Sequence, residues 1–219
     1  MDKTLLRPLQ PPILVNPIRI GSYTIPDNVI LAPMAGCTDL AQRLICRDHG
    51  ARFCFFEMLD ANSLIRRRNP PLEVLESCAE DRPIAGQILG RDPQMMLDAA
   101  LKLLQLVDIP FIDINFACPV RKVIRKKAGA YLLRDLSTMS KIIEKLSSGL
   151  PIPVTVKLRV GYDRHDLNEA RVIAKRCRDA GAKAIFVHGR LATQLYHGNS
   201  DNRPIKAMKD AVDIPVFAS

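Results

Sequence analysis

The run Phe111-Ile-Asp-Ile-Asn115 is a short, mainly apolar segment of β-forming residues that ends on a polar amide. Six more short β-rich runs recur along the chain, at residues 29–32, 53–57, 84–88, 154–157, 184–187 and 216–218. Segments with apolar residues at helical spacing separate most of them, for example residues 95–106 and 142–146. This alternation predicts an α/β protein in which parallel strands are joined by crossover helices.

Polar residues at the strand ends decide between two architectures. Nearly continuous apolar strands suit any parallel sheet that helices cover, so a doubly wound open sheet and a barrel both fit. Five of the strands, however, have a polar residue at the carboxyl end or just past it: Glu57, Gln87, Asn115, Lys157 and His188. In a TIM (β/α)8 barrel such ends converge on one mouth, whereas in an open sheet a ligand meets mainly the strands beside the switch point. We therefore predict a TIM barrel with a site at its mouth.

The two ends of the chain carry separate expectations. Ile18-Arg-Ile20 and Tyr23-Thr-Ile25 flank Gly21-Ser22, which predicts a β-hairpin that closes the amino-terminal end of the barrel. We expect residues 1–17 to form an extended arm and residues 18–219 to form the barrel domain. Because a full barrel has eight strands and the seventh run ends at Ala218, we expect an incomplete barrel of about seven strands.

Composition narrows the class of protein. The 32 Lys and Arg residues outnumber the 23 Asp and Glu residues, and the net charge of +9 favours a polyanionic partner without requiring one. The six cysteines include no C-x-x-C pair, so they indicate neither a zinc site nor a disulfide framework, and a reducing cytoplasm fits best. Apolar runs fall far short of the roughly 20 residues of a membrane span, and the first residues lack a secretory signal. We expect a cytoplasmic protein with no membrane contact.

Five motifs, taken together and in chain order, carry a resemblance to a known family. They are Ala32-Pro-Met-Ala-Gly-Cys-Thr-Asp39, Ala85-Gly-Gln-Ile-Leu-Gly90, Asp113-Ile-Asn-Phe-Ala-Cys-Pro119, Lys157-Leu-Arg159 and His188-Gly-Arg190. With Tyr196-His-Gly-Asn199 added, the chain resembles the tRNA-dihydrouridine synthases from about Ile18 to Ser219, most closely those of bacteria. The resemblance implies reduction of the C5=C6 bond of selected uridines in tRNA to 5,6-dihydrouridine. It also implies FMN as the cofactor and NADPH as the reductant that recharges it.

The resemblance assigns cofactor-binding roles at four places. Pro33, Met34 and Ala35 follow the first strand and are expected to line the flavin edge, with a proline-stopped strand as the plain alternative. Gln87 both donates and accepts hydrogen bonds, as a pyrimidine edge demands. Lys157 is expected to place a positive charge where negative charge develops on reduction. His188 is carried over as a further cofactor contact. For each of these three, a purely structural role stays open.

Cys118 is the expected catalytic residue. Hydride arriving at uracil C6 leaves enolate-like charge over C5 and the C4 oxygen, so an acid must protonate C5 from the other face. A thiol suits this role because its reference pKa of about 8.5 keeps it mostly protonated at neutral pH. Free cysteines usually only pack in protein cores, but a Cys-Pro in the loop after a strand is a poor packing site.

Substrate-binding roles are expected for a further set of polar residues. Asn115 is expected to hold the uracil edge or the flavin, and Arg159 and Arg190 to meet the substrate or its phosphate, with plain surface solvation as the alternative. The basic run after the catalytic loop is expected to clamp tRNA phosphates while the target base is flipped into the pocket, with a merely solvated face as the alternative. Its five cations are Arg121, Lys122, Arg125, Lys126 and Lys127.

Two departures from the family pattern bear on function. Ala117 stands where the family usually has glycine, which demands a negative φ or some strain at that residue. The sequence ends Phe217-Ala-Ser219, without the family's later phosphate-binding loops or its helical tRNA-binding domain. We therefore expect this chain by itself to bind FMN poorly and tRNA weakly.

Two rival hypotheses remain. One is an FMN-dependent dihydroorotate or dihydropyrimidine dehydrogenase that acts on a free base, but such an enzyme has no need of five cations beside its mouth. The other is a non-catalytic tRNA-binding relative. Intact Cys118, Lys157 and Gln87 favour catalysis over this second hypothesis.

Overall fold

The computed structural model describes residues 16–66 and 72–219, so the expected arm lies almost entirely outside the described residues. A hairpin of β1 (Ile18–Ile20) and β2 (Tyr23–Ile25) comes first. The other strands are β3 (Cys54–Asp60), β4 (Ile84–Leu89), β5 (Ile112–Phe116), β6 (Val154–Arg159), β7 (Ile185–His188) and β8 (Val216–Ala218). The helices are α1 (Leu40–Asp48), α2 (Ala61–Arg66), α3 (Pro93–Leu106), α4 (Arg121–Arg125), α5 (Leu136–Gly149), α6 (Leu167–Asp179) and α7 (Arg203–Lys209), with 3₁₀ turns at Leu72–Leu75, Ala79–Asp81 and Gly129–Arg134.

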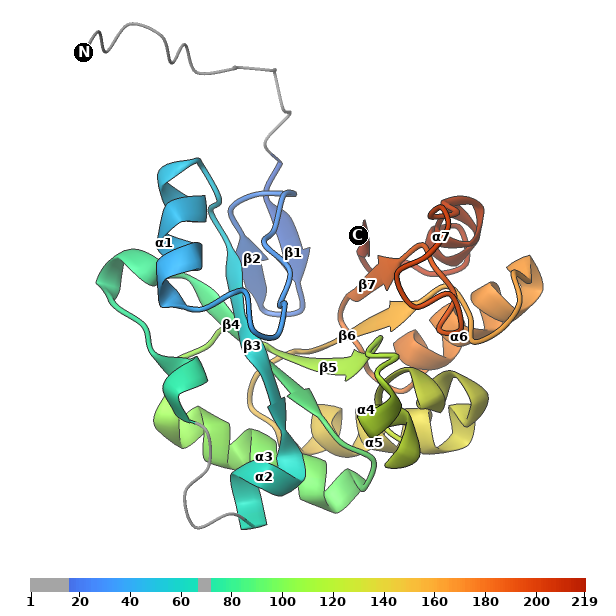
Figure 1. The fold of residues 1–219 in the computed structure, drawn as a ribbon, viewed down its shortest axis with the longest axis horizontal. Coiled ribbons are helices and arrows are strands. Elements are labelled where there is room, and N and C mark those ends of the chain that lie inside the picture. The colour runs from blue at the N-terminus through green and yellow to red at the C-terminus, as the bar shows by residue number, and fades with distance from the viewer. Residues whose placement is uncertain (1–15, 67–71) are drawn as a thin grey trace, which may run out of the picture.

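The six strands β3 to β8 form one parallel sheet in chain order. Figure 1 shows this sheet curving with its helices along the outside and the β1–β2 hairpin near the space that the curve encloses. The predicted parallel barrel with crossover helices is thus confirmed. In the described part of the chain β8 pairs only with β7. Parallel pairing places Gln87 beside Asp113 and Asn115 beside Lys157, and residues so paired face the same side of the sheet.

The first predicted strand, residues 29–32, is reduced to a single parallel bridge between Leu31 and Cys54. Two local features explain the difference. The Asp27 carboxylate accepts a hydrogen bond from the Val29 amide at 3.1 Å, which takes that donor away from a ladder. Pro33 has no amide hydrogen to continue the pairing. The Leu31 amide still donates to the Phe53 carbonyl, next to β3, at 3.0 Å.

Two apolar cores lie on the two faces of the sheet. The larger one packs α2, α3, α5, α6 and α7 against the outward-facing residues of the strands. The smaller one fills the barrel interior and includes Ile20 and Ile25 of the hairpin, which confirms the prediction that the hairpin closes this end. Six rings, here called the aromatic floor, are in mutual contact there, with Phe53 stacked on Phe111 at 5.2 Å between ring centroids and Phe186 stacked on Phe217 at 4.7 Å. The other two members are Tyr23 and Phe55.

The helix boundaries follow the capping signals of the sequence. Asp92 accepts a hydrogen bond from the Met95 amide at 2.8 Å and Pro93 opens α3, as the Asp-Pro pair predicts. Gly181, with φ of +106°, follows the end of α6 in the left-handed region that favours glycine. In the described ranges no helix combines the length and the apolar composition that crossing a bilayer requires.

Candidate active site

A cleft of about 630 Å³ opens where the carboxyl ends of the strands meet the loops that follow them. This volume lies within the usual range for small-molecule sites. Eleven of the residues proposed from the sequence line it: Pro33, Met34, Ala35, Gln87, Asn115, Cys118, Lys122, Lys157, Arg159, His188 and Arg190. Arg121 faces a separate pocket, and Lys126 is paired with Asp60 at 2.9 Å. The structure therefore brings most of the candidate residues together and leaves two of them outside.

A chain of buried hydrogen bonds runs under the cleft and sets the direction of two amide side chains. Thr155 Oγ1 and Gln87 Nε2 donate to the two oxygens of Asp113, at 2.6 and 2.7 Å. Because the carboxylate only accepts, Gln87 must turn its Oε1 the other way, and there it accepts from Asn115 Nδ2 at 2.8 Å. Asn115 Oδ1 in turn accepts from the Ala117 and Cys118 amides at 3.0 and 2.8 Å. Asp113 thus orients the loop that carries Cys118.

The loop around Cys118 is held from both sides. The Cys118 carbonyl accepts a hydrogen bond from the Ala130 amide at 3.0 Å. Gly129 has φ of +59°, and a side chain there would bring its Cβ within 2.7 Å of the Cys118 carbonyl oxygen, so glycine is needed for this approach. Ala117 does not have a positive φ. Alanine therefore fits without strain at the position where the family usually has glycine.

The Cys118 thiol is half-buried at the cleft wall. Burial raises its pKa above the ordinary value, while a hydrogen bond from the Val120 amide and the charge of Arg159 oppose the rise. The thiol therefore stays protonated at neutral pH, as a proton donor requires. The amide and the guanidinium would also stabilise the thiolate that remains after the proton has left.

Burial disfavours the charged forms of Lys157 and Asp113. Burial lowers the pKa of Lys157 to about 8, while the nearby Asp113 opposes the shift. Burial raises the pKa of Asp113 to about 6, against the hydrogen bonds from Thr155 and Gln87 and the charge of Lys157. Both groups remain predominantly charged at pH 7. The Lys157 ammonium, which also donates to Ser219 Oγ at 2.8 Å, puts a positive charge in the lining of the cleft.

The buried carboxyl of Asp113 predicts an unusual pH dependence of stability. The folded protein, in which the pKa is about 6, keeps a proton that the unfolded chain releases near pH 4. The stabilisation from this group is thus fully present below about pH 4 and is lost as the pH rises through about 6. The free energy of unfolding of the wild type, measured against Asp113→Asn by urea denaturation, should fall by up to about 3 kcal/mol between pH 4 and 7.

Asp135→Asn provides the control for this experiment. Hydrogen bonds from Thr138 hold the pKa of Asp135 below its usual value, so its stabilisation is lost as the pH falls, the opposite direction. If the difference between wild type and Asp113→Asn is flat over this range, or rises with pH, the prediction for Asp113 is wrong.

His188 presents one ring nitrogen to the cleft. Its Nδ1 lies 2.9 Å from the Ser219 carbonyl oxygen, and since a carbonyl only accepts, Nδ1 carries the proton. Burial lowers the pKa of His188, and the charges of Arg159, Lys157 and Arg190 act in the same direction. The ring is therefore neutral at pH 7 and offers Nε2 as a hydrogen-bond acceptor.

Arg159, the last residue of β6, joins the loops after β5 and β7 instead of lying in solvent. Its side chain is only 3% exposed and donates to the carbonyls of Ala117, Leu191 and Leu195 at 3.0, 2.9 and 2.8 Å. The Tyr196 ring centroid lies 5.9 Å from its guanidinium carbon. Arg190, by contrast, is half-buried, and its guanidinium donates to the Gly198 carbonyl at 3.1 and 3.0 Å. A role for Arg159 toward the substrate stays a prediction, but its first role is to fix these loops.

Glu57 does not belong to the cleft lining. It lies inside β3, which runs three residues past it, and a register shift interrupts the pairing with β4 between Phe55 and Met58. Its Oε2 accepts a hydrogen bond from the Gly36 amide at 2.7 Å. Glu57 therefore supports the loop that carries Pro33, Met34 and Ala35 from behind.

Comparison with known proteins places the chain in a family. Residues 30–219 match the family model described as dihydrouridine synthase. The chain belongs to the dihydrouridine synthase family. Similar members of the dihydrouridine synthase family include tRNA-dihydrouridine synthase B of Pseudomonas aeruginosa, 42% identical over 92% of this chain and 60% of the relative. A probable tRNA-dihydrouridine synthase of Rickettsia bellii is 37% identical over 92% of this chain and 62% of the relative. The chain thus spans about 60% of the length of the relatives that it matches.

Solved structures confirm the fold class of this dihydrouridine synthase family member. Histamine dehydrogenase from Rhizobium sp. 4-9 superposes on 94% of this chain and 42% of its own, with a TM-score of 0.69 and 11% identity. Morphinone reductase superposes on 94% of this chain and 79% of its own, with a TM-score of 0.59 and 11% identity. At such low identity the likeness extends to the fold alone.

Proposed function

We propose that the protein is the barrel of a tRNA-dihydrouridine synthase, which reduces the C5=C6 bond of uridine in tRNA with FMN as cofactor and NADPH as reductant. One observation carries the proposal. Cys118, on the loop after β5, shares a single cleft with Gln87, Lys157 and His188 from three other strands. Membership of the dihydrouridine synthase family supports the choice of substrate.

The residues of the cleft fit a flavin ring. Apolar groups from Ala32, Pro33, Met58 and Ala117 line it and would cover a flat ring, with polar groups confined to a few places. Gln87 uses one amide hydrogen and one lone pair inside the protein, which leaves one of each for a pyrimidine edge. Together with the Lys157 ammonium, which favours negative charge on a ligand, this is the donor set that the cofactor requires.

The chain's own residues have distinct tasks in the reaction. Gln87 and Lys157 would hold FMN, which, once reduced by NADPH, would supply a hydride to uracil C6. Cys118 Sγ then gives its proton to C5, and the Val120 amide and Arg159 stabilise the thiolate that is left. Asp113, acting through Gln87 and Asn115, keeps the Cys118 loop in the geometry for this transfer. Neutral His188 offers Nε2 as an acceptor, and Arg190 and Lys122 at the rim contact the RNA.

The cellular context belongs to the same proposal. The positive net charge of +9 supports tRNA as the partner. The six cysteines are all unpaired, which supports a reducing cytoplasm. The hairpin at residues 18–25 packs into the barrel interior, which supports a barrel domain that begins at residue 18.

The proposal is tested by direct assay. The purified full-length gene product, supplied with excess FMN and NADPH, should convert uridine to dihydrouridine in an unmodified tRNA transcript, as measured by mass spectrometry of the digested nucleosides. Parallel reactions contain NADH in place of NADPH, or free uracil or orotate in place of tRNA. Absence of product with tRNA would overturn the proposal, and turnover of a free base without turnover of tRNA would support the rival dehydrogenase.

A further inference from the structure

A second pocket, of about 240 Å³, lies beside the cleft and has no role in the reaction described above. It is formed by Pro119, three residues of α4, Tyr162, and three residues of the segment 192–195. We propose that this pocket, here called the flanking pocket, binds a nucleotide that neighbours the reacting uridine in the RNA strand. The inference rests on the proposed function and adds to it a specific contact outside the catalytic cleft.

Helix α4 and the loop at residues 192–196 lie between the two cavities and line both of them. In α4, Arg121, Ile124 and Arg125 line the flanking pocket, whereas Lys122 and Val123 line the cleft. This division follows from helical geometry, in which residues three and four apart share a face. Pro119 lines both cavities. An RNA strand whose reacting base enters the cleft can therefore reach the flanking pocket across this wall.

The loop after β7 also lines both cavities with consecutive residues. Leu195 lines the flanking pocket, and the next residue, Tyr196, lines the cleft. Leu195 adopts φ of +52°, an unusual backbone conformation for a residue with a side chain, and its carbonyl accepts a hydrogen bond from Arg159 at 2.8 Å. The wall between the cavities is thus anchored from inside the barrel on this side as well.

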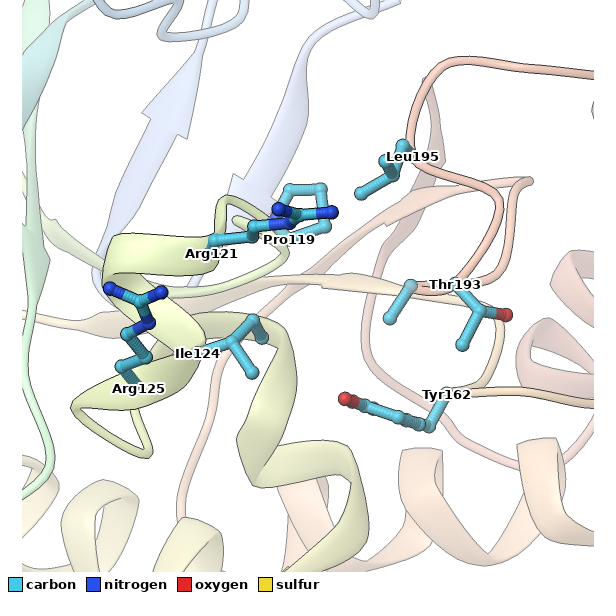
Figure 2. Close-up of a pocket in the computed structure, with 8 residues that line it drawn as sticks. Pro119, Arg121, Ile124, Arg125, Tyr162, Thr193 and Leu195 are labelled. Carbon is cyan, nitrogen blue, oxygen red and sulfur yellow. The ribbon is translucent and has the colours of Figure 1, made fainter.

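The charges of the flanking pocket suit a phosphate. Arg121 and Arg125 are exposed, and within residues 16–66 and 72–219 neither guanidinium has a carboxylate or a carbonyl partner. The neighbouring Lys126, by comparison, is bound to Asp60. Figure 2 shows the Arg121 side chain extending over Pro119 toward Leu195, with Arg125 further along the same helix. Guanidinium groups bind phosphate oxygens through paired hydrogen bonds.

The inner part of the pocket suits the sugar and base that follow such a phosphate. Ile124, Ala192 and Leu195 provide apolar walls, and Tyr162 provides a hydroxyl. Figure 2 shows the Tyr162 side chain directed toward Ile124 across the pocket. The Tyr162 carbonyl accepts a hydrogen bond from the Thr193 amide at 2.9 Å, which holds the backbone at this residue, and the Arg134 guanidinium carbon lies 5.0 Å from the centroid of the Tyr162 ring. An aromatic ring beside cations is the usual surface for single-stranded RNA.

The first test measures binding of unmodified tRNA, at several salt concentrations and independently of catalysis. The double variant Arg121→Ala/Arg125→Ala should raise the Kd about tenfold and flatten the salt dependence, since each lost phosphate contact removes about 0.7 from the logarithmic slope for a single strand. The double variant Lys141→Ala/Lys145→Ala changes the net charge equally on exposed residues of α5 and should leave the Kd unchanged. Equal effects of the two double variants would mean that only net charge matters, which overturns the inference.

The second test asks whether one nucleotide occupies the pocket. Once the reduced uridine is mapped, tRNAs are made with an abasic site at the neighbour on its 5′ or 3′ side. The loss of affinity from Tyr162→Ala, about tenfold, should be much smaller on one of these two tRNAs, because that RNA has already lost the stacking partner. Tyr162→Phe retains the ring and should behave as wild type in this comparison. If the fold-losses of affinity from Tyr162→Ala and from the abasic site multiply at both neighbours, the ring and the missing base act independently. That outcome would contradict the assignment of one neighbouring nucleotide to the flanking pocket.

The two proposals fail in different ways. Suppose that the wild type forms dihydrouridine and that Arg121→Ala/Arg125→Ala binds tRNA with wild-type affinity. This result would reject the nucleotide-binding role of the flanking pocket and leave the proposed activity standing. Wild type that binds tRNA through these arginines but forms no dihydrouridine would reject the proposed activity alone. Preferential competition by an acidic peptide over RNA at this pocket would reject a nucleotide as its ligand.

Discussion

Replacing Cys118 by alanine is expected to lower dihydrouridine formation on tRNA by about 10²- to 10⁴-fold, the usual range for loss of a positioned general acid. The thiol lies in the cleft with Gln87 and Lys157, and burial keeps its pKa above the ordinary value, so it is protonated at neutral pH, as the proposed donation to C5 requires. The measurement is single-turnover dihydrouridine formation with saturating tRNA. Oxidation of NADPH by the flavin in the absence of tRNA should be unchanged, because that step needs no proton donor at C5.

Cys37→Ala is the matched control, because Cys37 is a second cysteine that lines the same cleft and is exposed. It should retain wild-type turnover. Cys118→Ser should lie near the alanine variant, since a hydroxyl is a much weaker acid than a thiol. Single-turnover rates within a few-fold of wild type in Cys118→Ala would show that the proton comes from another group.

Replacing Arg159 by leucine is expected to cost about 3 kcal/mol or more of folding free energy. The change leaves two buried carbonyls, those of Ala117 and Leu191, and the partly buried carbonyl of Leu195 without their donor, and each buried unsatisfied group costs about 1–3 kcal/mol. For a domain of this size the melting temperature should fall by roughly 10 °C, as followed by circular dichroism. Limited proteolysis should cleave first in the loops after β5 and β7, which Arg159 joins.

Arg190→Leu separates this anchoring role from a simple loss of charge. Arg190 stands two residues beyond β7 and binds one carbonyl at the rim, so its replacement should cost under about 1 kcal/mol. Arg159→Lys should fall between the two leucine variants, because one ammonium cannot replace the planar fork of a guanidinium. A similar loss of stability in Arg190→Leu and Arg159→Leu would contradict the anchoring role.

Local patterns predicted the fold because they do not depend on distant partners. The β-rich runs, the hairpin around Gly21-Ser22 and the Asp92-Pro93 cap each depend on residues within a few positions of one another. The first strand was overestimated because the ladder is limited by Asp27 and Pro33 just outside the apolar centre of the run. An apolar pattern does not show whether the amides of a run are already engaged.

The sequence predicted those residues of the candidate site whose position at the end of a strand is enough to place them in the cleft. Gln87, Asn115, Lys157 and His188 reach the cleft because the carboxyl ends of parallel strands converge. Asp113 received no role because its partners, Gln87 and Thr155, lie 26 and 42 residues away, on the two neighbouring strands. The only sequence signal was a carboxylate within a buried apolar run, which has to find a partner.

Arg159 and Lys126 show the same limit for charged residues. Sequence reasoning set substrate contact against solvation for both, yet each has an internal partner, carbonyls for Arg159 and Asp60 for Lys126. Those partners are 42 and 66 residues away, so spacing along the chain contains no trace of them. The separate pocket behind α4 was missed because it takes residues from three loops at once.

The aromatic floor gives this barrel a practical use in protein engineering. Interlocked rings from Tyr23 to Phe217 pack with Ile20 and Ile25 of the hairpin in the barrel interior, and most of their contacts are with one another. Libraries that vary the mouth loops therefore leave these ring contacts intact, and most selected variants should retain the fold. Base preference could thus be evolved in the laboratory with a small loss of stability.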